Sequence, residues 1–565
     1  MKLKTPDALV ARYSGAAFPA ILAGAILLIA GSLMAWTYDR SIMGDLTIYF
    51  YPAGPQWLTL LAGVLAIFLI LIPRLGFLHG LAEHFNPAAA LKALGTTTLI
   101  AVVILLGGIV QPLGGLVNLD PGAWVAFAGA LVLFLGSRVL PLPEPTDASD
   151  VRLKSTLEIL VIVVMMSIAL FGSAYILGID ESWHFTGLLI FVGGLVLATF
   201  RFGYFGWVAH LANRHRRVLT LAAFAVAFLF PFTQDGSDAN MSIAAQILIF
   251  SATAMGLNIV VGLAGLLDLG YIAFLGSGAY VAAILSASAF STVDWQPPFM
   301  VVVLIGGVVA AIFGLIIGSP TLRVSGDYLA IVTLGFGEIF RLGMNNLDGS
   351  NGPDLTNGPN GIAAIPNLNF FGFDFGATHE VFGLTLGRFS NYYFLLLILI
   401  AFVILVFARL NDSRIGRGWV AIREDEKAAE AMGVNIFGLK LLAFAVGAFL
   451  AGLAGTIKAH QDVSVTPDQY VFLESAFLVA AIVLGGMGTI AGVLIGATVL
   501  KLMPEKLRFF AENRLLLFGL VLILMMRFRP EGLVASKRRQ LEFHEEDEEL
   551  ADAIESDLLV EDVKK

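Results

Sequence analysis

The chain has 565 residues and contains no cysteine. Disulfides, thiolate nucleophiles and cysteine-based metal sites are therefore excluded. The sequence also lacks a GxxxxGK[ST] loop, the phosphate-binding signature of many ATPases, and it lacks HExxH or another paired-histidine spacing. We therefore expect no catalytic residues, no metal site and no cofactor on this chain.

Charged residues are scarce, at 14% of the chain, whereas soluble domains contain about 25%. Hydrophobic residues make up 58%, and the mean hydropathy is +0.85. A span needs about 20 apolar residues, and long uncharged stretches of that kind recur throughout. The sequence predicts an all-α polytopic membrane protein with about 14–16 transmembrane helices.

The net charge of −9 belongs to the end of the chain. Residues 541–565 hold 11 acidic residues and two lysines, and subtracting them from the 43 acidic and 34 basic residues leaves 32 of each. We interpret 536–565 as an acidic, disordered cytoplasmic tail, which gives no reason to expect a cationic substrate. The few basic residues border the spans, which argues against nucleic-acid binding.

Charge and hydropathy divide the rest of the chain into two regions. Residues 1–235 form an N-terminal membrane region of about seven spans, to which the sequence assigns no role. Residues 241–535 form a second region of about nine spans, one of them predicted at 263–286. Basic clusters at 214–217 and 527–539 predict cytoplasmic loops, so that both termini are cytoplasmic.

The loop 411–438 is the most charged segment before the tail, and its arginines place it in the cytoplasm. Within it, 423–433 predicts a short surface helix. Acids in its first turn oppose the helix dipole, its alanines favour helix with little bulk, and Gly433 suits the C-terminal cap. The candidate residues of this helix are Arg423, Glu424, Asp425, Glu426, Ala428, Ala429, Glu430 and Gly433.

This helix resembles the cytoplasmic coupling loop of ABC importers, whose Ala-Ala-x-x-x-Gly signature docks on an ATPase subunit. Ala428, Ala429 and Gly433 match, although Lys427 stands where the generic motif often has glutamate. The longer string 421–433 is similar to the LivM-type branched-chain amino-acid permeases. Segments 256–280, 485–488, 529–533 and 356–362 also resemble this family, in an order that covers 241–535.

The resemblance implies an ABC importer permease core at 241–535, preceded by a hydrophobic extension. It implies leucine, isoleucine and valine as cargo, carried into the cytoplasm across the bacterial inner membrane by alternating access. Its partners would be two ABC ATPase subunits that hold ATP and Mg, a second, LivH-like permease and a periplasmic amino-acid-binding protein. Urea or another amide is an alternative cargo. An ion-coupled carrier and a structural membrane subunit are alternative functions.

Polar residues inside predicted spans are candidates for the translocation path, because a charge there is costly unless it has a partner or a cavity. They are Asn258, Asp268, Glu338 and Arg341. Asp268 could line the passage or cap a helix that is broken after Gly265. Asn258 could pack against a neighbouring helix, and Glu338 and Arg341 could form a structural pair.

A long stretch rich in glycine, asparagine and proline, 345–391, predicts an external loop. By its resemblance to the family's Gly-rich loop, we expect Thr356, Gly358 and Gly361 to contact the binding protein.

Overall fold

The computed structural model describes residues 7–38, 55–75, 84–141, 154–179, 182–286, 288, 290–321, 327–350, 352–370, 372–381, 383–506, 514–528 and 531–534. The predicted tail 536–565 lies outside the described residues. The chain divides into two compact units. Unit 1 comprises residues 1–234 and 505–511, and unit 2 comprises residues 235–504 and 512–565.

The prediction of an all-α polytopic membrane protein is confirmed. The described residues contain eleven helices that are long and apolar enough to cross a membrane, and two shorter apolar helices, Gln56–Leu71 and Ile272–Ile284. Strands are limited to two hairpins among these residues. The chain is therefore a multi-pass membrane protein, and the total of about 14–16 spans stays a prediction.

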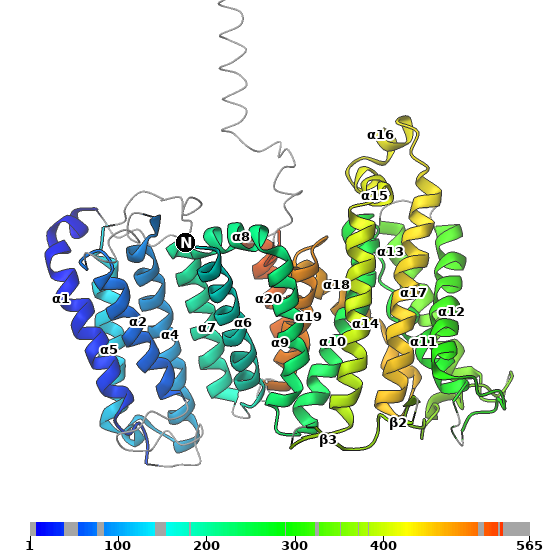
Figure 1. The fold of residues 1–565 in the computed structure, drawn as a ribbon, viewed down its shortest axis with the longest axis horizontal. Coiled ribbons are helices and arrows are strands. Elements are labelled where there is room, and N and C mark those ends of the chain that lie inside the picture. Colours follow the sequence, from blue (N-terminus) through cyan, green and yellow to red (C-terminus); the bar gives the residue numbers. More distant parts are fainter. Residues whose placement is uncertain are drawn as a thin grey trace, which may run out of the picture. The chain divides into compact units, whose positions relative to one another are not determined.

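Unit 1 is a bundle of helices (Figure 1). Its helices are α1 (Asp7–Ser32), α2 (Gln56–Leu71), α4 (Pro87–Leu113), η1 (Leu116–Asn118), α5 (Pro121–Arg138), α6 (Ser155–Leu177), α7 (Ser182–Phe202), α8 (Tyr204–Arg214), α9 (Arg216–Leu229) and η3 (Phe230–Thr233). Helices α1 and α5 pack through glycines: a Cβ at Gly24 would lie 2.6 Å from the Leu133 backbone nitrogen. Such small residues let helices approach closely where the hydrophobic effect does not drive association.

A buried carboxylate in unit 1 fixes the turn between α8 and α9. Glu158 of α6 is 1% exposed, and its two oxygens contact Arg214 Nη1 at 2.5 Å and His215 Nε2 at 2.7 Å. A buried charge is tolerated only when it is paired in this way. These contacts hold α6 against the α8–α9 turn.

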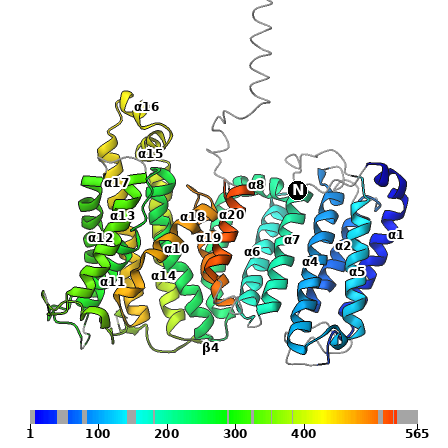
Figure 2. The same ribbon diagram turned by 180° about the vertical axis from the view of Figure 1, so that it is seen from behind.

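Unit 2 contains the other helices, and Figure 2 shows them from behind. They are α10 (Asp238–Asn258), the π-helix η4 (Ile259–Leu263), α11 (Ile272–Ile284), α12 (Phe299–Thr321), α13 (Asp327–Asn346), η5 (Gly358–Asn360), α14 (Arg388–Asn411), α15 (Arg414–Glu424), α16 (Glu426–Ala431), α17 (Ile436–Asp462), η6 (Pro467–Tyr470), α18 (Phe472–Gly485), α19 (Ile490–Lys506) and α20 (Arg514–Phe528).

Helix α17 is central to unit 2, because it packs against α10, α11 and α12. Its small residues make this close packing possible. A Cβ at Gly278 of α11 would lie 2.1 Å from the Gly452 carbonyl oxygen, and a Cβ at Gly455 would lie 2.0 Å from the Leu275 carbonyl oxygen. Side chains of any size at these positions would separate the helices.

The predicted span 263–286 is wrong in its first part. The chain leaves η4 at Leu263, runs without helix through 264–271, and α11 begins only at Ile272. The break depends on Gly265, whose φ of +72° is unfavourable for other residues. Ser475 Oγ then accepts a hydrogen bond from the Ile272 backbone N–H at 3.0 Å, which satisfies one free donor at the helix start.

The loop between α13 and α14 carries both hairpins. Strand β1 (Asn369–Phe370) pairs antiparallel with β2 (Phe373–Asp374), and β3 (His379–Val381) pairs with β4 (Leu384–Leu386). In unit 2 these strands lie at the opposite end from α15 and α16 (Figure 1). We call these the loop end and the α15–α16 end of unit 2.

We expect Gly278→Val to destabilise unit 2 by overpacking, at a cost of about 1–3 kcal/mol. The added side chain has no room beside Gly452. The matched control is Gly343→Val in α13, where a Cβ would meet no atom within 4 Å. Thermal unfolding of the detergent-purified protein measures the difference. Equal melting temperatures for the two variants would contradict the packing argument.

Candidate functional site

The helix predicted at 423–433 is in fact parts of two helices. Arg423 and Glu424 end α15, and α16 covers only Glu426–Ala431. Asp425 separates them, with an extended backbone (φ −153°, ψ 109°) and a side chain that accepts a hydrogen bond from the Ala428 N–H. Aspartate favours this capping role over a helix interior, which is why the helix breaks here.

Gly433 caps the C-terminal end of α16, as predicted from the sequence. This residue has a φ of +83°, and its N–H donates to the Glu430 carbonyl at 2.9 Å. The Val434 N–H donates to the Ala429 carbonyl at 3.1 Å. The pair of bonds closes the helix with a left-handed glycine.

The matched alanines have different environments. Ala429 is 4% exposed and packs inside the segment, whereas Ala428 is exposed. Met432, which the sequence did not single out, is 85% exposed. Its place directly before the predicted glycine cap could have marked Met432 as an exposed apolar residue.

Helices α15 and α16 are anchored to the start of α17. The buried Trp419 of α15 donates from Nε1 to the Leu439 carbonyl at 2.7 Å. Lys440 of α17, with a side chain 5% exposed, places its Nζ 2.7 Å from Glu426 Oε1. Each of the two helices is thus held to α17 by one of these contacts.

Arg423 connects the same segment to a second part of the core. Its Nη1 donates to the Gly262 carbonyl in η4 at 2.9 Å, and its Nη2 lies 2.7 Å from Glu424 Oε1. The arginine stem passes so close to Gly265 that a Cβ there would lie 2.5 Å from Arg423 Cγ.

The motifs at 256–280 and 485–488 meet beside this contact. Asn258 is fully buried, and its Oδ1 accepts a hydrogen bond from the Gly488 N–H at 2.9 Å. A Cβ at Gly262 would lie 2.7 Å from that same nitrogen. Asn258 therefore has the geometry of a helix-packing contact, and its role in the path stays a prediction.

The motif at 529–533, described from residue 531 onward, joins the cluster. The N–H groups of Leu533 and Val534 donate to the carbonyls of Leu484 and Gly485 at 2.9 and 2.8 Å. The structure thus brings together motifs that lie more than 200 residues apart in the sequence. We call this set the motif cluster: Asn258, Gly262, Arg423, Gly485, Gly488, Leu533 and Val534.

The other polar candidates contact residues outside the motif cluster. Asp268 is 1% exposed and sits in the break before α11, where its Oδ1 accepts from the Gly270 N–H at 2.9 Å. This bond forms an Asx-turn within the break, and the N-cap residue of α11 itself makes no side-chain capping bond. Arg341 Nε contacts Glu338 Oε2 at 2.9 Å within α13, and its Nη1 lies 3.5 Å from Asp468 Oδ1 in η6. Whether these residues line a passage stays a prediction.

The three loop candidates lie inside the loop, and their contact with a binding protein stays a prediction. Thr356 is fully buried, and its Oγ donates to the Met344 carbonyl at 2.6 Å. Gly358 is buried too, and a Cβ at Gly361 would lie 2.1 Å from the Val465 carbonyl oxygen. They fix the loop to the helices, whereas Pro359 and Asn360 between them are exposed.

Comparison with known proteins identifies the family to which this chain belongs. Residues 240–526, slightly more than half of the chain, match the profile of the branched-chain amino acid transport system permease component. The chain belongs to this family. The matched range begins close to the start of unit 2 at residue 235, and residues 1–234 of unit 1 lie outside it.

Individual relatives agree with the family match. The permease is 38% identical over 340 residues to the high-affinity branched-chain amino acid transport system permease protein LivM of Salmonella typhimurium, covering 58% of this chain and 76% of the relative. LivM of Escherichia coli K12 is 38% identical over 338 residues, with the same coverage. LivH of Salmonella typhimurium is 25% identical over 290 residues, covering 50% and 91%. No solved structure matches the chain significantly.

We expect Arg423→Met to loosen the contact between α15 and η4, because it removes the donor to the Gly262 carbonyl. Loss of a hydrogen bond from a charged group costs about 1.5–3 kcal/mol. Hydrogen–deuterium exchange should therefore rise in 259–265 and 414–424. Arg417→Met, at an exposed position of α15, is the control and should leave exchange in 259–265 unchanged. Identical exchange in both variants would refute the link.

Proposed function

We propose that this chain is a membrane-spanning permease subunit of an ATP-driven importer that moves leucine, isoleucine and valine into the cytoplasm by alternating access. The observation that carries the proposal is the family match across 240–526. The names of the LivM relatives specify branched-chain amino acids, at 38% identity. Membership in a permease family agrees with a transport subunit that performs no chemistry of its own.

The complete importer would contain two ABC ATPase subunits, a second permease and a periplasmic amino-acid-binding protein. The similarity to LivH supports a partner permease of related sequence. ATP and Mg would bind on the ATPases. In the inner membrane, the α15–α16 end and both termini would face the cytoplasm, and the loop end would face the binding protein.

Helix α16 is suited to transmit the movement of an ATPase. Ala428 of α16 and Met432 directly after it are exposed, whereas Ala429 is buried and supports the fold of the helix. The Lys440–Glu426 pair connects α16 to α17, and Arg423 connects α15 to η4. An ATPase that binds the segment differently in two states would shift the core between two arrangements, since a partner can act only through its differential contacts.

We expect Met432→Glu to weaken co-purification with the ATPase pair by about 30-fold, which corresponds to the roughly 2 kcal/mol of an interface hot spot. The exposed side chain has little role in the fold of the segment. Met432→Leu is the matched control and should retain the ATPases. If Met432→Glu retains the ATPases as well as the wild type does, Met432 does not lie in the interface.

Transport itself is tested in proteoliposomes that contain the assembled complex. Uptake of radiolabelled leucine should require ATP and the binding protein, and excess isoleucine or valine should compete with it. Uptake driven by a proton gradient without ATP would favour an ion-coupled carrier instead. Competition by urea, with none by isoleucine or valine, would indicate an amide cargo.

A further inference from the structure

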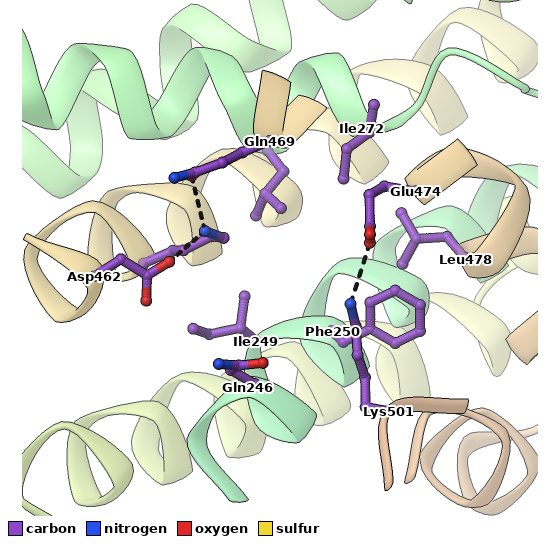
Figure 3. A pocket seen from close by; sticks show the side chains of 11 residues that line it. Gln246, Ile249, Phe250, Ile272, Asp462, Gln469, Glu474, Leu478 and Lys501 are labelled. Carbon is purple, nitrogen blue, oxygen red and sulfur yellow. Dashed lines mark hydrogen bonds and ion pairs between the residues drawn. The ribbon is translucent and has the colours of Figure 1, made fainter. Parts of the chain in front are cut away.

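Unit 2 contains a hollow of about 300 Å³ among α10, α11, α17, α18 and α19 (Figure 3). This is at the lower end of the volumes of ligand pockets, roughly 300–1,000 Å³. We call it the loop-end pocket. Its lining residues are Gln246, Ile249, Phe250, Ile272, Leu275, Lys458, Asp462, Gln469, Glu474, Leu478 and Lys501.

The loop-end pocket holds two ion pairs. Lys501 Nζ lies 3.1 Å from Glu474 Oε2. Lys458 Nζ contacts Asp462 Oδ2 and also donates to Gln469 Oε1 at 3.2 Å. Figure 3 shows Asp462 and Gln469 on one side of the hollow, and Glu474 and Lys501 on the other. The lining therefore presents two cations and two anions with no net charge.

These charged groups are accessible to a ligand. Their side chains are 21–32% exposed, so that a ligand in the pocket can reach them. A ligand carboxylate placed at one lysine and a ligand ammonium at one carboxylate would replace the contacts that are lost, because charge-assisted hydrogen bonds form with both groups.

Between the ion pairs the lining is aliphatic and aromatic. Ile249 and Ile272 are each 4% exposed, and Leu478 is fully buried. Lys501 Nζ also lies 4.6 Å from the centroid of the Phe250 ring, which stabilises the ammonium by a cation–π contact. This surface fits a branched aliphatic group.

We propose that the loop-end pocket binds the zwitterion of a branched aliphatic α-amino acid. The carboxylate lies at Lys501, the ammonium lies at Asp462 or Glu474, and the aliphatic side chain packs against Ile249, Ile272 and Leu478. The charge arrangement selects the zwitterion. The identity of the ligand as the importer's cargo rests on the proposed function.

The position of the loop-end pocket agrees with delivery from the loop end. Asp462 is the last residue of α17, and three residues later Val465 pairs with Ile362 of the loop. Glu474 lies in the first turn of α18. The charged groups therefore lie beside the loop and not beside α15 and α16.

The test measures binding of radiolabelled leucine to the purified full-length chain in nanodiscs, without ATPases or binding protein. We expect Lys501→Met and the double variant Asp462→Asn, Glu474→Gln each to weaken binding at least about tenfold, because each removes the charged partner of one end of the ligand. Lys501→Arg keeps the charge and should retain binding. Lys154→Met, at an exposed lysine before α6, is the matched control and should bind as wild type does.

Leucine analogues test the recognition of the zwitterion. Leucinol lacks the carboxylate and 4-methylpentanoate lacks the ammonium, so neither should displace leucine. Thermal unfolding of each variant verifies that it is folded. The proposal is overturned if wild type binds no leucine, if Lys501→Met is folded and binds as the control does, or if leucinol competes as well as leucine.

The outcome is separable from that of the proposed function. ATP-dependent leucine uptake by the complex, together with no leucine binding in nanodiscs, would contradict only the proposed binding site in the loop-end pocket. Leucine binding that depends on Lys501, without ATP-dependent uptake, would overturn the importer and leave the binding site in place.

Discussion

The close approach of α17 to α11 and α12 is the contact on which unit 2 depends. In a bilayer the hydrophobic effect does not drive helices together, so that packing and backbone proximity must do so. Gly278 and Gly452 bring two backbones together, and Gly306 lies against Thr456 of α17. With side chains of any size there, α17 would move away from its neighbours, and the groups at its two ends would lose their positions.

Helix α17 therefore connects two functional regions. Its 27 residues extend about 40 Å at 1.5 Å per residue. At one end, Lys440 holds α16 and the Leu439 carbonyl holds Trp419. At the other end, Lys458 and Asp462 line the loop-end pocket. Under the proposed function, this single helix would connect the segment that binds the ATPase with the pocket that binds the cargo.

Much of the candidate site could be predicted from local sequence, because its signals are local. The cap at Gly433 needs only a left-handed position after a run of helix formers. The split between α15 and α16 was missed, because Asp425 fits a helix first turn as well as it fits an N-cap. For the loop residues Thr356 and Gly361, the sequence predicts a contact with the binding protein, but it does not predict their burial in the loop. Their burial comes from Met344 and Val465, which a loop motif does not reveal.

By itself the sequence determined the membrane class, the family and the order of the motifs, since hydropathy, charge and short strings are properties of neighbouring residues. Only the tertiary structure decided that Asn258, Arg423 and Gly488 meet, and that Lys501 pairs with Glu474. The two residues of this pair are 27 positions apart, and only the packing of α18 and α19 brings them into contact.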